Sequence, residues 1–589
     1  MQNFNGPIST NKFYANFFLG GQNMSTFTHP YSVSWSKGAG NASSNGLAIS
    51  HIDANMIASG DNDPSIPGNP VRYYLNPIGI QSMLLSAVEL GSSTVLGTQN
   101  LSPFAAHVVL QPRAGAGQNI TFPLVQGMGF VTGVYSNMQP LVESSVMFRD
   151  MTPVGSPRNG VLKYRVTLEN NETWLVYVVT TAGNGALQFV SQTTIRGSPG
   201  FSGFIQVAKN PSGLSGEKLY DNSSGAYAVD GTVNGSVSGT TGTYSLSWTK
   251  VGLNANSTPL LMFAQPHHVQ SFDSDTASRN TSIQLRTTTK GMGTAVIGES
   301  WTMTEPNLPL SMGFGPWSEP GSNAVHALSP TAQSEILAVA PSELSQDVGA
   351  QSNLNSMYFS GKALSKFATL IWTVSKLGNN PGMAQPALDA LKSAFARFVN
   401  NTQQVPLVYD NVWKGVVSSA SYDGGSPGED FGNTFYNDHH FHYGYFVHTA
   451  AIIGALDPSW IPANRDWVNT LVRDAGNAAK DDPYFPFSRS FDWYNGHSWA
   501  KGLFDSGDGK DQESTSEDSM FAYALKMWGN TIGDSSMEMR GNLMLAILRR
   551  SFHNYFLMES DNVNQPSNFI PNKATGIVSS SFFFFRPFY

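Results

Sequence analysis

The chain has 589 residues and a mass of 63.6 kDa, enough for several domains that each bury a core. Its 33 Lys and Arg against 41 Asp and Glu give a net charge of −8 with no basic run, which excludes nucleic acid and anionic membranes as partners. The absence of cysteine excludes disulfides, thiol nucleophiles and cysteine-ligated metals. No apolar stretch approaches the roughly 18 residues that a membrane span needs.

Residues 1–290 have the pattern of β-strands separated by turns rich in Gly, Ser and Asn. Leu162, Tyr164 and Val166 alternate with polar residues, a period of two that turns one face of a strand inward. Asn170 then begins a turn into a second apolar strand, which predicts a hairpin. We expect an N-terminal antiparallel β-sandwich domain over residues 1–290.

The apolar period changes toward 3.6 residues after about residue 325. This change predicts helices near 329–340, 362–377, 386–401, 439–456, 463–480, 512–529 and 535–556. Strands followed by helices indicate segregated domains. We expect a small α/β connecting domain over 291–370 and a helical domain over 371–578. Residues 579–589, SSSFFFFRPFY, form an aromatic tail without a helical period.

The segment FYNDHHFHYGYFVHTAAIIGAL, which starts at residue 435, has the densest group of titratable and aromatic side chains. Asp438 is followed there by His439, His440 and His442. Such side chains could bind zinc, although their spacing matches no defined metal class. They could also be core or capping histidines at a helix start. The third interpretation is a polar cleft with aromatic walls that binds carbohydrate.

A second cluster lies in the loop that precedes the helix predicted near 512–529. Trp493, Tyr494, His497 and Trp499 form an amphipathic aromatic set there, typical of a surface on which sugars stack.

Glu513 and Glu517 lie four residues apart where that helix is predicted to start. Ser514 and Glu517 also have the spacing of a capping box, so a structural role for Glu517 stays open. If both glutamates face one cavity, repulsion and desolvation raise the pKa of one of them.

Three long strings carry a resemblance to a known family. NDHHFHYGYFVHTAAIIGALDPSW, RSFDWYNGHSWAKGL and DGKDQESTSEDSMFAYALKMWG resemble the catalytic module of endo-β-1,3-glucanases of glycoside hydrolase family 81. PISTNKFYANFFLG, HPYSVSW, SMYFSGKAL and PLVYDNVWKG extend the resemblance over most of residues 5–578. It implies a β-sandwich, a small connecting domain and a C-terminal (α/α)6-type toroid. It also implies inverting hydrolysis of β-1,3-glucan without metal or cofactor.

The resemblance also implies roles for individual residues. Asp438, in the DHHFHYGY string, corresponds to the general acid, Glu513 to the general base, and Glu517 to a second glutamate that assists or positions. An inverting reaction needs such an acid and base on opposite sides of the scissile bond. Contacts to sugar are expected from Tyr436, His439, His442, Trp493, Tyr494, His497 and Trp499.

Several expectations concern the protein as a whole. The family continues beyond FIPNKATGIV with more helices, so we expect a toroid that is incomplete in this chain, with reduced activity. Ten Asn-x-Ser/Thr sequons and the resemblance favour an extracellular or cell-wall protein, although the first residues show no secretory signal. We expect a monomer. Two alternatives stay open: a β-glucan-binding protein without catalysis, and a metal-dependent hydrolase built on the histidine cluster.

Overall fold

The structure is a computed structural model. It describes residues 6–38, 43–60, 62, 64, 69–75, 80–316, 328–422 and 424–575, and the backbone of 577–579 and 583–584.

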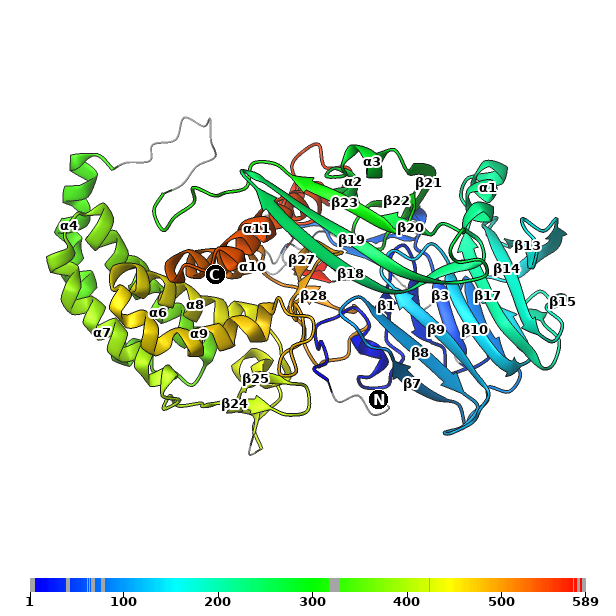
Figure 1. The fold of residues 1–589 in the computed structure, drawn as a ribbon, viewed down its shortest axis with the longest axis horizontal. Helices are drawn as coiled ribbons and strands as arrows, with labels where there is room; N and C mark the ends of the chain where they lie inside the picture. Colours follow the sequence, from blue (N-terminus) through cyan, green and yellow to red (C-terminus); the bar gives the residue numbers. More distant parts are fainter. Residues whose placement is uncertain are drawn as a thin grey trace.

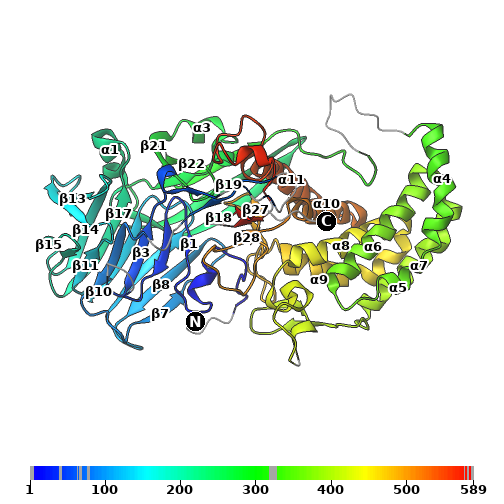
Figure 2. The same cartoon turned by 180° about the vertical axis from the view of Figure 1, so that it is seen from behind.

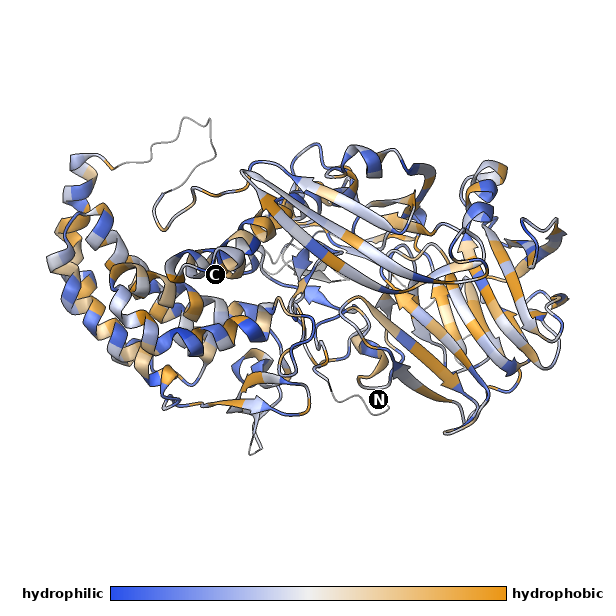
Figure 3. Cartoon of the chain, in the orientation of Figure 1, coloured by the Kyte–Doolittle hydropathy of each residue, from blue (hydrophilic) through white to orange (hydrophobic). Residues whose placement is uncertain are grey.

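Two antiparallel sheets face each other across a shared apolar core in the N-terminal part (Figure 1). One sheet has the order β1 (Thr26–Phe27), β2 (Ser32–Trp35), β3 (Gly46–Ser50), β6 (Met83–Ala87), β11 (Pro140–Glu143), β16 (Thr194–Arg196) and β15 (Gln188–Ser191). The other has the order β12 (Phe148–Val154), β13 (Val161–Leu168), β14 (Thr173–Ala182), β17 (Phe201–Lys209), β10 (Val131–Met138), β9 (Asn119–Val125), β8 (Ala105–Gln111) and β7 (Val95–Gln99). The expected β-sandwich is therefore present, with apolar residues along its strands (Figure 3).

Smaller sheets follow the sandwich. A long hairpin of β18 (Ala226–Ser238) and β19 (Thr241–Gly252) reaches from the sandwich toward the helices (Figure 1). It pairs with β23 (Ser300–Glu305), while β20 (Leu261–Ala264) and β21 (Asn280–Arg286) flank β22 (Met292–Ile297). The first strands of the expected connector, β22 and β23, thus pair with earlier strands. Short elements among these sheets are α1 (Gly213–Ser223), α2 (Pro266–Val269), α3 (Ser274–Ala277), β4 (Ala58–Ser59) and β5 (Tyr73–Tyr74).

The C-terminal part is helical. Its helices are α4 (Pro330–Leu344), α5 (Val348–Gln351), α6 (Met357–Trp372), α7 (Pro381–Val399), α8 (His439–Leu456), α9 (Ile461–Gly476), α10 (Thr515–Ile532) and α11 (Ser535–Tyr555). Short strand pairs lie between them: β24 (Leu407–Asp410) with β25 (Gly415–Ser418), β26 (Phe491–Asp492) with β27 (His497–Ser498), and β28 (Asp511–Gln512) with β29 (Ile577–Ser579), which also pairs with β30 (Phe583–Phe584). Most of the predicted tail, 579–589, lies outside the described residues.

α8 lies at the centre of the helical part, packed against α6, α9 and α10. Most of its residues are buried, histidines included, because helices cover it on several sides. One apolar core continues from these helices into β19 and β23, where Trp248 and Trp301 pack against each other. The N-terminal residues also join the two parts (Figure 2): Asn11 donates to the carbonyl of Tyr436, and Lys12 to that of Phe491.

The predicted hairpin is confirmed, with one difference in which side chains face inward. β13 and β14 pair with Val166 opposite Trp174, as the alternation indicated. Leu162, however, is exposed, and its polar neighbour Lys163 is buried. Lys163 is stable inside because its ammonium is 2.8 Å from Glu217 and 2.9 Å from Asp221. A charge can be buried when hydrogen-bonded partners of opposite charge replace water.

Candidate functional site

Asp438 precedes the first turn of α8, at the end of a strained segment. Its φ of 59° is left-handed, and Asp430, Phe431 and Tyr436 just before it also have φ values of 47°, 55° and 66°. Each left-handed non-glycine residue costs about 1–3 kcal/mol, and such strain gathers at functional sites. The fold thus holds Asp438 in a conformation that is uncommon for residues other than glycine.

The imidazole of His442 anchors both ends of this segment. Its Nδ1 is 2.9 Å from the carbonyl oxygen of Asp438, and its Nε2 is 3.1 Å from that of Asp430. Because a carbonyl oxygen only accepts, both ring nitrogens must donate, which requires the charged imidazolium. Burial opposes this charge, but the Asp430 and Asp438 carboxyls outweigh burial and raise the pKa of His442.

The Asp430 carboxylate connects this segment to α6. It accepts from the Ser356 hydroxyl at 2.6 Å and from the Met357 amide at 2.9 Å, where α6 begins. Burial alone would raise its pKa, but the hydrogen bond from His442 and those from α6 lower the pKa of Asp430 to about 2. Asp430 is therefore an ionised group that fixes the start of α6 relative to the start of α8.

Glu517, in the first turn of α10, is held by two tyrosines. The hydroxyls of Tyr358 on α6 and Tyr445 on α8 each donate to its Oε1 at 2.7 Å. Burial and the neighbouring Glu517 raise the pKa of both tyrosines, so both stay protonated donors. Ser514 caps α10 as the sequence indicated, accepting from the Glu517 amide. The Glu517 carboxylate is thereby oriented by three helices.

Asp438 belongs to the same electrostatic group. Withdrawal from water raises its pKa well above the usual range, and the charges of Glu513, Asp511 and Glu517 raise it further, while His442 opposes the shift. Asp438 and Glu513 also act on the pKa of Tyr358, the tyrosine that binds Glu517. The three carboxylates predicted to be catalytic thus act on one electrostatic group, in which burial and the neighbouring carboxylates favour the protonated form of Asp438.

Three of the predicted sugar contacts outside the loop are bonded to protein groups, and His442, described above, is one of them. The Tyr436 hydroxyl donates to Asp410 at 2.8 Å. His439 is buried, with Nδ1 bonded to Asp474 and Nε2 to the carbonyl oxygen of Asn433. These side chains are buried, and their hydrogen bonds hold the start of α8 against neighbouring segments.

The aromatic set of the 490–500 loop is also buried. The exposed fractions of its side chains are 8% for Trp493, 2% for Tyr494, 0% for His497 and 2% for Trp499. The Tyr494 hydroxyl donates to the carbonyl of Phe263 and the Trp499 indole to Asp492, at 2.6 and 2.8 Å. The prediction of a solvent-facing platform is therefore wrong for this set, because the loop lies between the β-rich and helical parts.

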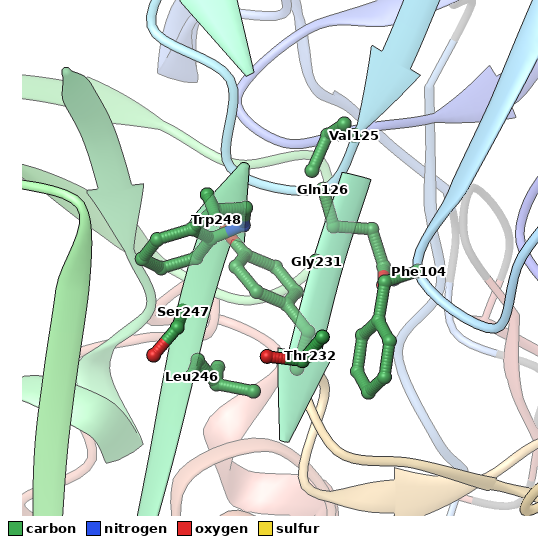
Figure 4. Close-up of a pocket in the computed structure, with 9 residues that line it drawn as sticks. Phe104, Val125, Gln126, Gly231, Thr232, Leu246, Ser247 and Trp248 are labelled. Carbon is green, nitrogen blue, oxygen red and sulfur yellow. The ribbon is translucent and has the colours of Figure 1, made fainter. Parts of the chain in front are cut away.

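Two cavities border this loop. The first, of about 10 Å³, lies between Phe104, Gly231 and Trp248 and also contacts Tyr494 (Figure 4). It can hold no more than about one water molecule. The second is a groove of about 760 Å³ between β18, α9 and α11, with Trp493 in its wall. Trp493 thus borders a space large enough for a ligand.

Within the described ranges, no group of three or more His, Asp or Glu side chains is arranged to hold a metal ion. In the same part of the chain, no helix has the length and hydropathy to cross a bilayer.

Sequence reasoning missed Asp430, Tyr358 and Tyr445. Tyr358 lies in the SMYFSGKAL string and Tyr445 in HYGY, so the family resemblance contained a signal for both. Asp430 lies in a glycine-rich loop with no pattern of its own, and its importance follows from contacts to α6 and α8 that are distant in sequence.

One solved structure resembles the fold, and curated relatives resemble the sequence over nearly all of this chain. A glycoside hydrolase family 81 structure from Clostridium thermocellum superposes with a TM-score of 0.73 at 20% identity, covering 100% of this chain and 75% of that one. A glucan endo-1,3-beta-D-glucosidase of Arthroderma benhamiae is 58% identical over 98% of this chain and 63% of its own length. The primary septum glucan endo-1,3-beta-D-glucosidase of Schizosaccharomyces pombe is 41% identical over 97% of this chain and 54% of its own length. This chain therefore spans between half and two thirds of those two relatives.

Family profiles cover nearly the entire sequence. The profile of the glycosyl hydrolase family 81 N-terminal domain matches residues 1–319, and that of the C-terminal domain matches residues 327–583. Glucan endo-1,3-beta-D-glucosidase 2 of Saccharomyces cerevisiae is 38% identical over 97% of this chain and 72% of its own length. With its β-rich N-terminal part and helical C-terminal part, the chain belongs to glycosyl hydrolase family 81.

Proposed function

We propose that this chain hydrolyses internal β-1,3-glucosidic bonds of β-1,3-glucan with inversion of configuration. The observation that carries the proposal is the grouping of Asp438, whose pKa is raised, with Glu513 and Glu517 at the starts of α8 and α10. An inverting glycosidase needs one carboxylic acid and one carboxylate on opposite sides of the bond. The relatives named as glucan endo-1,3-beta-D-glucosidases supply the substrate class.

Asp438 is the proposed general acid. Its raised pKa keeps a proton available for the glycosidic oxygen as the bond breaks. Glu513 is the proposed general base, which takes a proton from the water that attacks the opposite face of the sugar. An inverting pair is separated by about 6.5–9.5 Å, which leaves room for this water. Glu517, fixed by Tyr358 and Tyr445, positions the water or the sugar.

The proposal extends to the fold of the helical part, the place of action and the oligomeric state. The helices packed around α8 are proposed to be part of an (α/α)6-type toroid, with α6 and α10 beside α8. We propose that the protein acts outside the cell or in the cell wall, as the name of the septum relative from Schizosaccharomyces pombe suggests. It is proposed to act as a monomer without a metal or cofactor.

The direct test is release of reducing ends from laminarin by the purified chain, with a chelator present. The unaltered chain should be active, and Asp438→Asn and Glu513→Gln should each lower kcat by about 100-fold or more. Asp466→Asn, an exposed carboxylate on α9, is the matched control and should keep full activity. Absence of hydrolysis contradicts the proposal, and retention of the chain by laminarin in affinity electrophoresis would then favour a binding protein. Activity that the chelator abolishes favours a metal-dependent hydrolase.

A further inference from the structure

Two phenylalanines are exposed beside the carboxylate group. Phe431 is 47% and Phe359 is 50% exposed, and their ring centroids are 5.5 Å apart. Both rings also contact Tyr358, at centroid distances of 5.1 and 5.3 Å. Single exposed apolar residues are common on protein surfaces, but two phenylalanine rings packed on a half-buried tyrosine form a defined apolar surface.

The backbone conformation of Phe431 is strained. Its φ is 55°, and its two neighbours in the chain, Asp430 and Gly432, are also left-handed. A positive φ is an outlier for a bulky residue, because its side chain crowds the backbone. The anchors of the segment are His442, which binds the Asp430 carbonyl, and the start of α6, which binds the Asp430 carboxylate. The buried contacts of the segment thus hold an aromatic ring half in solvent in a strained backbone conformation, of the kind that gathers at functional sites.

Tyr358 connects this ring pair to the carboxylates. Its ring packs on Phe431, and its hydroxyl donates to Glu517 at 2.7 Å. Besides burial, the charges of Glu517, Asp438 and Glu513 raise the pKa of Tyr358. The apolar surface is therefore joined to the acidic group through Tyr358.

We propose that Phe431 and Phe359 form a sugar subsite, on which a glucose ring of β-1,3-glucan packs beside the carboxylates. The substrate class rests on the proposed function. The faces of a β-glucose ring present C–H groups, and its hydroxyls project from the rim. An aromatic surface therefore removes the C–H face from water while nearby polar groups meet the hydroxyls. The ammonium of Lys362, 3.2 Å from the Tyr358 hydroxyl, is one such polar group.

The position favours a sugar over the other possible occupants. A protein partner would need an apolar patch extending well beyond two rings. Tyr358, on which the ring pair packs, instead bonds to Glu517 and lies beside the Lys362 ammonium, a mixture of apolar and polar groups that matches a ligand with an apolar face and a polar rim. A subsite at this place would hold the polymer in register with Asp438.

The test is the binding of a β-1,3-gluco-oligosaccharide, measured by calorimetry. The Asp438→Asn variant is used so that binding is measured without hydrolysis of the ligand. Phe431→Ala and Phe359→Ala should each raise the dissociation constant about tenfold. Phe431→Tyr, which retains a ring, should bind within about twofold of the Asp438→Asn parent. Tyr484→Ala removes an aromatic side chain that is 57% exposed elsewhere, and it should leave binding unchanged.

Kinetics on laminarin with Asp438 intact give the second readout. The two alanine variants should raise KM more than they lower kcat, since a stacking subsite supplies binding more than chemistry. Unchanged binding in both alanine variants overturns the subsite, as does an equal loss in Tyr484→Ala. If the unaltered chain binds the oligosaccharide through Phe431 but hydrolyses nothing, the subsite stands and the proposed hydrolysis fails. If the unaltered chain hydrolyses laminarin and the alanine variants bind normally, the proposed hydrolysis stands and the subsite fails.

Discussion

At the scale of single residues, one cationic neighbour, His442, opposes the upward pKa shift of the proposed acid. Asp438 has a raised pKa because it is withdrawn from water and lies near other carboxylates, and the His442 imidazolium opposes that shift. The imidazolium is itself maintained by two carbonyl oxygens and by Asp430. The proton affinity of Asp438 therefore depends on a residue that does not need to touch the substrate.

Replacing His442 by Gln should shift the alkaline limb of the kcat/KM profile to higher pH. Loss of the positive charge favours the protonated form of Asp438, so its pKa rises and activity persists to higher pH. The measurement is the pH dependence of laminarin hydrolysis. His448→Gln, a buried histidine of the same helix that bonds to Ser365, is the control and should leave the limb unchanged. A limb that moves to lower pH in His442→Gln would contradict this assignment.

The sequence indicated which carboxylates lie near one another, but not which residues hold them in place. Asp438, Glu513 and Glu517 stand in strings that resemble family motifs, so their grouping could be expected. Asp430 could not be found this way, because its role arises from hydrogen bonds to α6 and to His442 on α8. The loop aromatics were predicted as a sugar surface because composition alone does not reveal burial, and Trp499 is in fact bonded to a buried aspartate.

At the scale of secondary-structure elements, periodicity predicted most of the fold. β19 buries Tyr244, Leu246 and Trp248, the apolar set of its alternation. α8 spans His439–Leu456, which matches the predicted 439–456, whereas α9 and α10 differ by a few residues at their ends. Helix ends are set by caps and tertiary contacts as well as by the apolar period. Periodicity does not show which strands pair when they are distant in sequence, so the pairing of β14 with β17 could be seen only in the structure.

A buried charge cluster joins three of these elements. Asp474 on α9 accepts from the amide of Val416 on β25, bonds to His439 on α8, and pairs with Arg489 at 3.6 Å. All four groups are buried or nearly so. The cluster thus fixes the start of α8, where Asp438 lies, relative to α9.

Asp474→Asn should destabilise the protein by about 3–5 kcal/mol, because it leaves the buried Arg489 without its counter-charge. Urea denaturation followed by circular dichroism measures this loss. Asp466→Asn, an exposed position on the same helix, is the matched control and should change the unfolding free energy by less than about 0.5 kcal/mol. Equal stability of the two variants would show that the cluster does not hold the helices together.

At the scale of the whole molecule, the β-rich and helical parts meet around a buried lysine. The Lys290 ammonium lies 4.7 Å from the ring centre of Tyr555 and 5.0 Å from that of Phe556, both at the end of α11. His497 donates from Nδ1 to the carbonyl of Ser498, so its Nε2 accepts from Lys290. Burial, partly opposed by Asp492, lowers the pKa of Lys290 from 10.5 to about 7.

This depressed pKa gives the junction a pH-dependent stability. Between pH 7 and 10.5 the unfolded chain binds the Lys290 proton and the folded chain does not, so the contribution of Lys290 to stability rises with pH and is lost as pH falls toward 7. Lys290→Met removes that slope. The unfolding free energy of the unaltered chain minus that of the variant should therefore grow by about 1.4 kcal/mol per pH unit between about pH 7 and 10.

Denaturation of both proteins at a series of pH values provides the measurement. Lys376→Met removes an exposed lysine of the helical part and should give a difference that stays flat with pH. A flat difference for Lys290→Met as well would mean that Lys290 is charged throughout this range in the folded protein.

The central proposal, inverting hydrolysis by Asp438 and Glu513, is tested most directly by the configuration of the first product. Proton NMR of a laminarin digest, recorded within the first minutes before mutarotation, distinguishes the α from the β anomer at the new reducing end. Because water activated by Glu513 attacks the face opposite the β-linked leaving group, the α anomer should appear first. Initial formation of the β anomer would contradict the assignment and would require a covalent intermediate on a carboxylate.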